Sequence, residues 1–226
     1  MSLPLIVTRP YPGGEATVRR ALARGVDARH MPLFAARALD WTAPDAGDFD
    51  ALLLTSAQAV RLAGAGLARL AALPVHAVGE ATADAARAAG LLVATVGDED
   101  AQSLLDAMTS QNIERILWLC GRDRSALDAH GAALAAVPCY AAEPVAPPAG
   151  WADAIAAPAV LLAHSSRAAE RIAALAGSAR AHLSLVAISP TVAAAAGPGW
   201  KEVGVAVRPD DAAILAEAHA LCHKGR

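Results

Sequence analysis

The sequence has few aromatic residues and no excess of positive charge. Only 4% of its 226 residues are Phe, Trp or Tyr, and its formal net charge at pH 7 is −3. Proteins that bind nucleic acid usually carry a basic face, and those that bind single strands also use aromatic rings for stacking. We therefore expect no nucleic-acid partner.

Cysteines and long apolar segments are also scarce. Cys120, Cys139 and Cys222 form no CxxC motif and no even set, so we expect free, buried thiols in a reducing cytosol. The N-terminal segment MSLPLIVTRP lacks the basic and apolar regions of a signal peptide. The longest uncharged stretch, residues 183–200, contains two prolines and several serine and threonine residues and is too weakly apolar for a membrane span. These features predict a soluble, cytoplasmic protein.

Several catalytic and cofactor motifs are missing. The sequence has no GxxxxGK[ST] phosphate loop and no glycine-rich fingerprint after a strand, which argues against a nucleotide-dependent enzyme. It has no GxSxG nucleophile elbow, so a hydrolase triad is unsupported. His219 and His223 share a helix face near Cys222, but no acid completes an HExxH pattern. We therefore expect no metal and no cofactor.

What the sequence does contain is a regular alternation of short apolar runs and alanine-rich helical stretches. The apolar runs are mostly continuous, as in parallel strands that helices cover on both faces. This alternation predicts an α/β fold with parallel sheets. The expected strands are 3–8, 51–55, 75–78, 91–96, 116–120, 160–163, 185–188 and 203–207, and the expected helices are 15–24, 58–70, 82–89, 103–108, 126–136, 168–176 and 212–221.

The chain also repeats itself once, at an offset of about 110 residues. Residues 55–61 resemble residues 164–170, and each segment directly follows an apolar strand. The strand-to-helix junction at 77–80 likewise resembles the one at 187–190. A single repeat of this length indicates two similar α/β modules rather than a solenoid array.

Two proline-containing segments interrupt the alternation. Residues 30–35 and 138–144 read as extended pieces without a following helix, and proline there is typical of edge strands and connectors. If the two segments pair, the chain leaves the first module, builds the second and then returns. We thus predict two flavodoxin-like modules, joined by a two-stranded antiparallel linker, with an active-site cleft between them. The first module comprises 1–32 and 147–226, the second 41–137, and the connecting strands 33–40 and 138–146.

Polar residues gather where the expected strands end. Ligands of open α/β sheets lie beyond the carboxyl ends of the strands, where helix N-termini present free N–H groups. Each serine or threonine there also fits a simple helix cap, but the set together favours anion binding. Arg9 directly follows the first strand, and arginine is a good two-pronged partner for carboxylates. The junctions are Thr8-Arg9, Thr55-Ser56, 79–82, Gly121-Arg122, Ser165-Ser166 and 189–191.

Tyr140 lies on the expected return connector, where the two modules meet. A phenol at this point is able to donate a proton to a departing hydroxyl without a metal or cofactor. Packing as an edge-strand aromatic is the alternative explanation for this residue.

The ordered set of junctions resembles the uroporphyrinogen-III synthase family. The matching segments occur in family order over essentially the whole chain. They are VTRP at 7–10, LTSAQAV at 54–60, AVGEATA at 77–83, Ile116-Leu117 before Gly121-Arg122, VPCY at 137–140, LLAHSS at 161–166 and AISPT at 187–191.

This resemblance implies two related domains in a monomer that cyclises hydroxymethylbilane. The reaction loses water and inverts ring D, giving uroporphyrinogen III for the biosynthesis of haem, sirohaem and other tetrapyrroles. Tyr140 is the implied acid for loss of hydroxide. The implied substrate contacts are Arg9, Thr55, Ser56, Gln58, Thr82, Ser165 and Thr191. The expected partner is this small molecule, with a transient contact to hydroxymethylbilane synthase and none to nucleic acid or membrane.

The sequence departs from the family pattern in its second half. Ser189 stands where the family usually has glycine, and Val192 where a second threonine is common. The segment from His164 to Ser166 replaces a more usual Thr-Ser-Pro. A non-catalytic two-domain module that binds a carboxylate-rich tetrapyrrole or another small molecule would carry the same residues, and it stays open as the alternative function.

Overall fold

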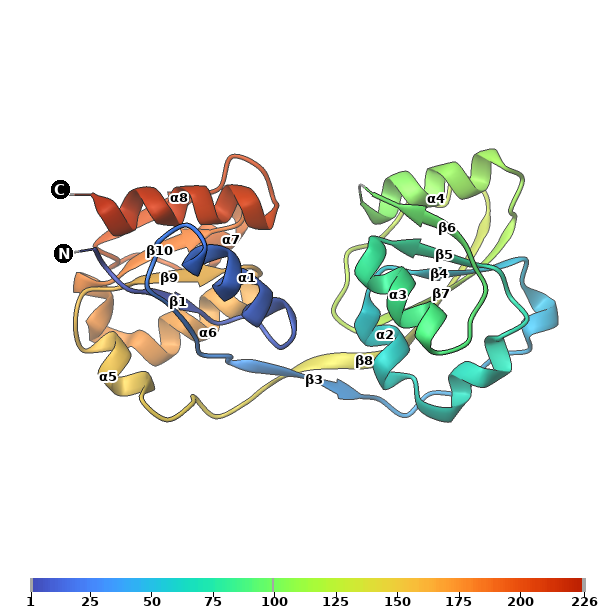
Figure 1. Ribbon diagram of the computed structural model, residues 1–226, viewed down its shortest axis with the longest axis horizontal. Coiled ribbons are helices and arrows are strands. Elements are labelled where there is room, and N and C mark those ends of the chain that lie inside the picture. Colours follow the sequence, from blue (N-terminus) through green and yellow to red (C-terminus); the bar gives the residue numbers. More distant parts are fainter. Residues whose placement is uncertain (1, 99, 225–226) are drawn as a thin grey trace. The chain divides into compact units, whose positions relative to one another are not determined.

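The computed structural model describes residues 2–98 and 100–224. Contacts divide the chain into two compact units: unit 1 comprises Met1–Ala35 and Pro144–Arg226, and unit 2 comprises Ala36–Glu143. Each unit is built around its own sheet with helices packed on it (Figure 1). The predicted α/β class with two parallel-sheet domains is therefore correct.

Unit 1 has a five-stranded parallel sheet in the order β11-β10-β9-β1-β2. Helices α1 and α8 pack on one face of this sheet, and α6, which also contacts α7, lies on the opposite face (Figure 1). The strands are β1 (Leu5–Val7), β2 (Ala28–His30), β9 (Val160–Ala163), β10 (Ser184–Ala187) and β11 (Glu202–Val205). The helices are α1 (Gly13–Leu22), α5 (Trp151–Ile155), α6 (Ser166–Ala176), α7 (Pro190–Ala195) and α8 (Asp211–His223), with a 3-10 helix over Gly177–His182.

Unit 2 carries most of a six-stranded sheet in the order β3-β8-β7-β4-β5-β6. The edge strand β3 and its neighbour β8 both cross the boundary between the units. The strands are β3 (Phe34–Ala38), β4 (Ala51–Leu54), β5 (Val75–Val78), β6 (Val93–Gly97), β7 (Arg115–Gly121) and β8 (Ala133–Pro144). The helices are α2 (Ala57–Leu62), α3 (Glu80–Ala88) and α4 (Ala101–Ser110), with 3-10 helices over Ala46–Asp48 and Gly64–Leu70.

The two sheets share one strand order when unit 2 is read from a different starting point. If the strands of unit 1 are counted in chain order, the order β2-β1-β9-β10-β11 reads second, first, third, fourth, fifth. This is the flavodoxin-like strand order. The order β8-β7-β4-β5-β6 in unit 2 matches it when β7 and β8 are taken as first and second. The repeat in the sequence falls on corresponding strands, since β4, β5 and β6 match β9, β10 and β11. Unit 2 is therefore a circularly permuted version of the unit 1 fold.

The helix predicted over 126–136 is wrong. Residues 122–132 form a loop, and β8 begins at Ala133, where it pairs with Arg115 of β7. The alanines of this segment favour a helix by intrinsic propensity, but pairing with the buried strand β7 overrides that preference. Loop 122–132 consequently makes the connection that α1 makes in unit 1.

The other expected strands and helices lie within a few residues of their predicted places. The single helix predicted over 58–70 is divided into α2 and a 3-10 helix at Gly64, whose φ of 62° no regular helix contains. The short elements β2 and α5 were not predicted, because three to five residues give too little periodicity.

The cysteines are free and buried, as the sequence analysis expected. Burial raises the pKa of Cys139 to about 12 and that of Cys120 and Cys222 to about 11. The thiols are therefore protonated and unreactive at neutral pH. Within the described residues, no helix has both the length and the apolar character needed to cross a bilayer.

A close approach at Gly14 provides a first test of the packing. A Cβ on Gly14 would lie 2.1 Å from Nε2 of His30 and 2.5 Å from the carbonyl oxygen of Arg9. That imidazole is itself fixed by a 2.9 Å hydrogen bond with the same carbonyl. We expect Gly14→Ala to lower the free energy of unfolding by at least about 2 kcal/mol in urea denaturation, because both ring and backbone must move.

Gly47→Ala is the matched control. Its Cβ would lie 3.5 Å from the nearest heavy atom, Oδ1 of Asp45, which is an ordinary contact. We expect it to change stability by less than about 1 kcal/mol. Equal losses in the two variants would contradict the packing described around Gly14.

Candidate functional site

In each sheet, one pair of neighbouring strands is followed by chain connections that run in opposite directions. The chain connections diverge between β1 and β9 in unit 1, and between β7 and β4 in unit 2. Ligands of open α/β sheets bind beyond the carboxyl ends of such strands, because the loops that follow them part there. The predicted junctions at Thr8-Arg9, His164–Ser166, Thr55-Ser56 and Gly121-Arg122 directly follow these four strands. Each unit thus brings two of the predicted junctions together.

In unit 2, Tyr140 lies at this edge. It pairs with Gly121 at the end of β7, and a Cβ on Gly121 would come within 2.9 Å of Cζ and 3.1 Å of the hydroxyl oxygen of Tyr140. The absent side chain at Gly121 therefore lets the phenol lie over the strand end. The side chain of Ser56, which follows β4, lies close enough to the phenol to lower its pKa. Ser56 in turn caps α2 by accepting a 3.2 Å hydrogen bond from the backbone N–H of Gln58.

The surroundings of Tyr140 keep its hydroxyl protonated. Burial raises the pKa of Tyr140 above its usual value, and the nearby side chain of Ser56 opposes this only in part. A half-buried phenol with a raised pKa holds its proton at neutral pH and retains a polar neighbour beside its oxygen. This arrangement is suited to donating a proton to a leaving group.

A second group of side chains lies at the same edge of unit 2, on the other face of the sheet. Thr55 accepts a 3.1 Å hydrogen bond from Nε1 of Trp118, which is buried beneath α4 and the loop after β7. The guanidinium carbon of Arg124 lies 5.4 Å from the centre of the Trp118 ring. Sequence reasoning missed Arg124, because its only signal is its place a few residues after the end of β7.

Thr82 is less accessible than the other predicted contacts. It lies in the first turn of α3, following β5, and is 5% exposed. The N-cap of this helix is Gly79, whose φ of 76° suits glycine, so Thr82 is not the cap that the simpler explanation assumed. Thr82 is thus almost fully buried within unit 2.

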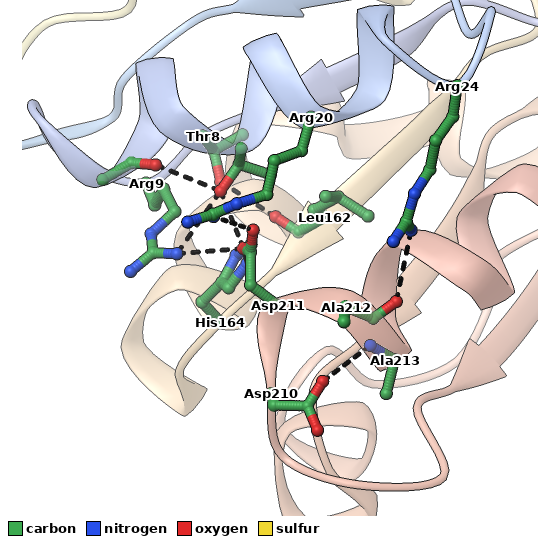
Figure 2. A network of polar contacts seen from close by, with 12 residues as sticks. Thr8, Arg9, Arg20, Arg24, Leu162, His164, Asp210, Asp211, Ala212 and Ala213 are labelled. Carbon is green, nitrogen blue, oxygen red and sulfur yellow. Dashed lines mark hydrogen bonds and ion pairs between the residues drawn. The ribbon is translucent and has the colours of Figure 1, made fainter. Parts of the chain in front are cut away.

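In unit 1, the polar groups converge on Asp211, the first residue of α8 (Figure 2). Its Oδ1 accepts hydrogen bonds from Oγ1 of Thr17 at 2.7 Å and from Nη1 of Arg9 at 3.0 Å. Its Oδ2 accepts from Nη1 of Arg20 at 2.5 Å, and Nε2 of His164 lies 3.4 Å from Oδ1. The network ties α1 to α8 across the ends of β1 and β9. Sequence reasoning missed Asp211 as well, because its only signal is an acidic residue at a helix start.

Electrostatics explains why this carboxylate is charged. Burial alone would raise the pKa of Asp211, but hydrogen bonds from His164, Thr17 and Arg20 and the charge of Arg9 hold it well below its usual value. The pKa of His164 is lowered, chiefly by burial, and its Nδ1 is buried without a hydrogen-bond partner in the described part of the chain. The imidazole is therefore neutral near pH 7.

The remaining predicted contacts in unit 1 lie at helix starts. Ser165 caps α6 by accepting a 3.2 Å hydrogen bond from the backbone N–H of Ala168, and Ser189 caps α7. Thr191 is exposed in the first turn of α7. The cap explanation thus accounts for the serines at 56, 165 and 189, and Arg9 has an ion-pair partner already.

The His219–His223 pair does not form a metal cluster. The two rings lie in contact with their centres 4.4 Å apart and their planes tilted by 55°. Over residues 2–98 and 100–224, no group of three His, Cys, Asp or Glu side chains is placed to hold a metal ion.

Comparison with protein families decides the relationship that the junctions suggested. The family model described as uroporphyrinogen-III synthase HemD matches residues 15–216. The chain belongs to this family. The match confirms the resemblance stated from the sequence. Members of the uroporphyrinogen-III synthase family are hydro-lyases of tetrapyrrole biosynthesis.

A solved structure of the family shares the fold. Uroporphyrinogen-III synthetase from Helicobacter pylori 26695 matches with a TM-score of 0.64 at 17% identity, over 98% of this chain and 100% of that one. A mutant uroporphyrinogen III synthase from the extremely thermophilic bacterium Thermus thermophilus has a TM-score of 0.46 at 17% identity, over 96% of this chain and 98% of that one. Compared with curated protein sequences, the chain has no significant match.

The Asp211 network generates a prediction on stability. The lowered pKa of Asp211 means that its carboxylate stabilises the fold above its unfolded pKa of about 3.9, and that this stabilisation is lost as the pH falls through the folded pKa. Asp211→Asn keeps an acceptor for Thr17 but removes the charge facing Arg9 and Arg20. We expect it to lower the free energy of unfolding by about 1–3 kcal/mol at pH 7 in urea denaturation.

The difference in the free energy of unfolding between wild type and Asp211→Asn should be smaller at pH 3, because part of the stabilisation by the wild-type carboxylate is lost below its unfolded pKa. Asp27→Asn is the control, since Asp27 and Arg29 form an exposed pair 3.7 Å apart. It should cost less than about 0.5 kcal/mol. A loss in Asp211→Asn that stays constant with pH would show that the charge is not responsible.

Proposed function

We propose that this protein is an active uroporphyrinogen-III synthase, which cyclises hydroxymethylbilane with loss of water and inversion of ring D. The observation that carries the proposal is the protonated phenol of Tyr140 beside Ser56, at the carboxyl ends of β4 and β7. Membership of the family supports the same reaction.

Tyr140 supplies the proton on which the first step depends. The terminal hydroxyl of hydroxymethylbilane leaves as water when the phenol protonates it, which leaves a phenolate and the substrate as an azafulvenium cation. The Ser56 hydroxyl then stabilises the phenolate by donating a hydrogen bond to it. The last pyrrole attacks this cation through its substituted α-carbon and forms a spiro intermediate. The bond from that carbon to its original methylene bridge then breaks, and the bridge re-forms to the free α-carbon of the same pyrrole, which inverts ring D. That carbon loses its proton to the phenolate when the ring regains aromaticity, which regenerates the phenol of Tyr140.

The remaining task is to hold a flexible, carboxylate-rich chain in the geometry that inverts only one ring. Positioning of this kind supplies a large part of a catalytic effect without further chemical groups. In the proposal, Thr55, Ser56, Gln58 and Thr82 of unit 2, and Arg9, Ser165 and Thr191 of unit 1, remain the substrate contacts. A carboxylate that reaches Arg9 shares its guanidinium with Asp211. We also expect a monomer that receives its substrate from hydroxymethylbilane synthase.

A non-catalytic module that binds a carboxylate-rich small molecule is the second candidate. It is favoured by the fact that several expected contacts already have structural partners: Ser165 caps a helix, and Arg9 is paired with Asp211. Such a module needs no acid, so the role of Tyr140 separates the two candidates.

The test is to supply hydroxymethylbilane from a coupled deaminase and to separate the oxidised products as isomers I and III. We expect isomer III well above the protein-free control. Tyr140→Phe should lower turnover by more than about tenfold while stability stays within about 1 kcal/mol, because only one hydroxyl is lost. Tyr11→Phe, which alters the other tyrosine of the chain, is the control and should retain turnover.

Each alternative gives a distinct result in this assay. Isomer I alone, from a folded protein that still binds uroporphyrinogen, would favour the binding module. Isomer III at an unchanged rate from Tyr140→Phe would remove Tyr140 from the mechanism and leave the synthase reaction in place.

A further inference from the structure

Most arginines near the candidate site are neutralised by carboxylates of the chain. Arg9 is paired with Asp211 in unit 1, and Arg122 lies 2.7 Å from Glu143 in unit 2. Arg124 differs from them. In the part of the chain that the structure describes, no carboxylate lies within ion-pair distance of its guanidinium.

Arg124 is nevertheless held in a defined place. Its Nη1 donates hydrogen bonds to the carbonyl oxygens of Gly121 and Arg122, each at 3.3 Å. Its guanidinium also lies against the ring of Trp118, which is 4% exposed and fixed by the hydrogen bond to Thr55. An arginine whose side chain is already ordered loses less entropy when it binds a ligand.

The free edge of this guanidinium suits a carboxylate. Hydrogen bonds among the described residues use only Nη1 of Arg124 and leave Nε and Nη2 available. These two nitrogens form the two-pronged donor that arginine presents to carboxylates. The residue is exposed to solvent, so the edge is accessible.

The place of Arg124 connects it to the proposed reaction. The carbonyl that it binds belongs to Gly121, the residue over which the Tyr140 ring lies. Loop 122–132, whose residues are all described, joins β7 to β8 as α1 joins β1 to β2 in unit 1. Unlike that connection, it contains no helix.

We propose that Arg124 is a substrate-binding residue that holds an acetate or propionate carboxylate of the tetrapyrrole through Nε and Nη2. This assignment rests on the proposed function, because it takes the substrate to be a carboxylate-bearing pyrrole chain. It adds a cation that is free to bind substrate at the edge of unit 2 where Arg122 is paired with Glu143.

The experiment measures binding of uroporphyrin, a tetrapyrrole with acetate and propionate groups, by calorimetry, together with kinetics of hydroxymethylbilane conversion. We expect Arg124→Gln to raise the Kd for uroporphyrin and the KM for hydroxymethylbilane about tenfold, with kcat within about twofold. The salt dependence of binding should become weaker, because one charge contact is lost. Arg115→Gln is the matched control and should change Kd by less than about twofold, since Arg115 lies at the opposite end of β7 from Gly121 and already pairs with Asp50.

A purely structural role for Arg124 predicts a different pattern. It would lower stability in urea denaturation and reduce kcat, while the salt dependence of binding stayed as in the wild type. That pattern would overturn the assignment. If Arg124→Gln does not fold, Arg124→Lys decides the question: the lysine keeps the charge but loses the two-pronged geometry, so we expect a Kd raised about threefold. An unchanged Kd in this variant would also overturn it.

The two proposals fail in distinguishable ways. Wild-type formation of isomer III, with unchanged KM and Kd in Arg124→Gln, overturns the role of Arg124 alone. If the wild type binds uroporphyrin but forms no isomer III, and Arg124→Gln loses this binding, the synthase activity is overturned and the carboxylate site is supported. A wild type that neither binds uroporphyrin nor forms isomer III overturns both.

Discussion

The candidate site depends on the divergence of chain connections at the centre of each sheet. Between β7 and β4, and between β1 and β9, successive connections run in opposite directions, so the loops at the carboxyl ends part. Circular permutation changes where the chain enters a unit, but it preserves strand order and therefore preserves this opening. Residues from distant parts of the sequence, such as Ser56 and Tyr140, become neighbours only for this reason.

The two units use the same opening differently. In unit 1, α1 brings Thr17 and Arg20 to Asp211, whose carboxylate is shared by the guanidiniums of Arg9 and Arg20. In unit 2, the corresponding connection is loop 122–132, which supplies Arg124 without a helix and, among the described residues, without an acid to pair with it. The arginines of the unit 1 network thus have an acidic partner within the unit, whereas the described part of unit 2 presents a protonated phenol and an unpaired cation at one edge. The proposed chemistry accordingly rests on unit 2.

Sequence patterns were informative wherever a local rule applied. Continuous apolar runs predicted buried parallel strands, and polar residues after them predicted the helix caps at Ser56 and Ser165. The helix predicted over 126–136 was wrong, because alanine propensity is worth only a fraction of a kcal/mol per residue and pairing with β7 outweighs it. Asp211 and Arg124 were missed for a related reason: an exposed-looking acid at a helix start and an arginine in a loop carry no local signal of their partners.

The sequence by itself determined the α/β class, the repeat of two modules and the family, since periodicity and ordered strand ends are written locally along the chain. Only the tertiary structure decided which polar groups share an edge and which of their charges are cancelled. The contacts of Tyr140 with Ser56 and Gly121, and of Arg9 with Asp211, join residues far apart in the chain. Burial and the distance between charges set the pKa of a phenol or a carboxylate, and both quantities exist only after the chain has folded.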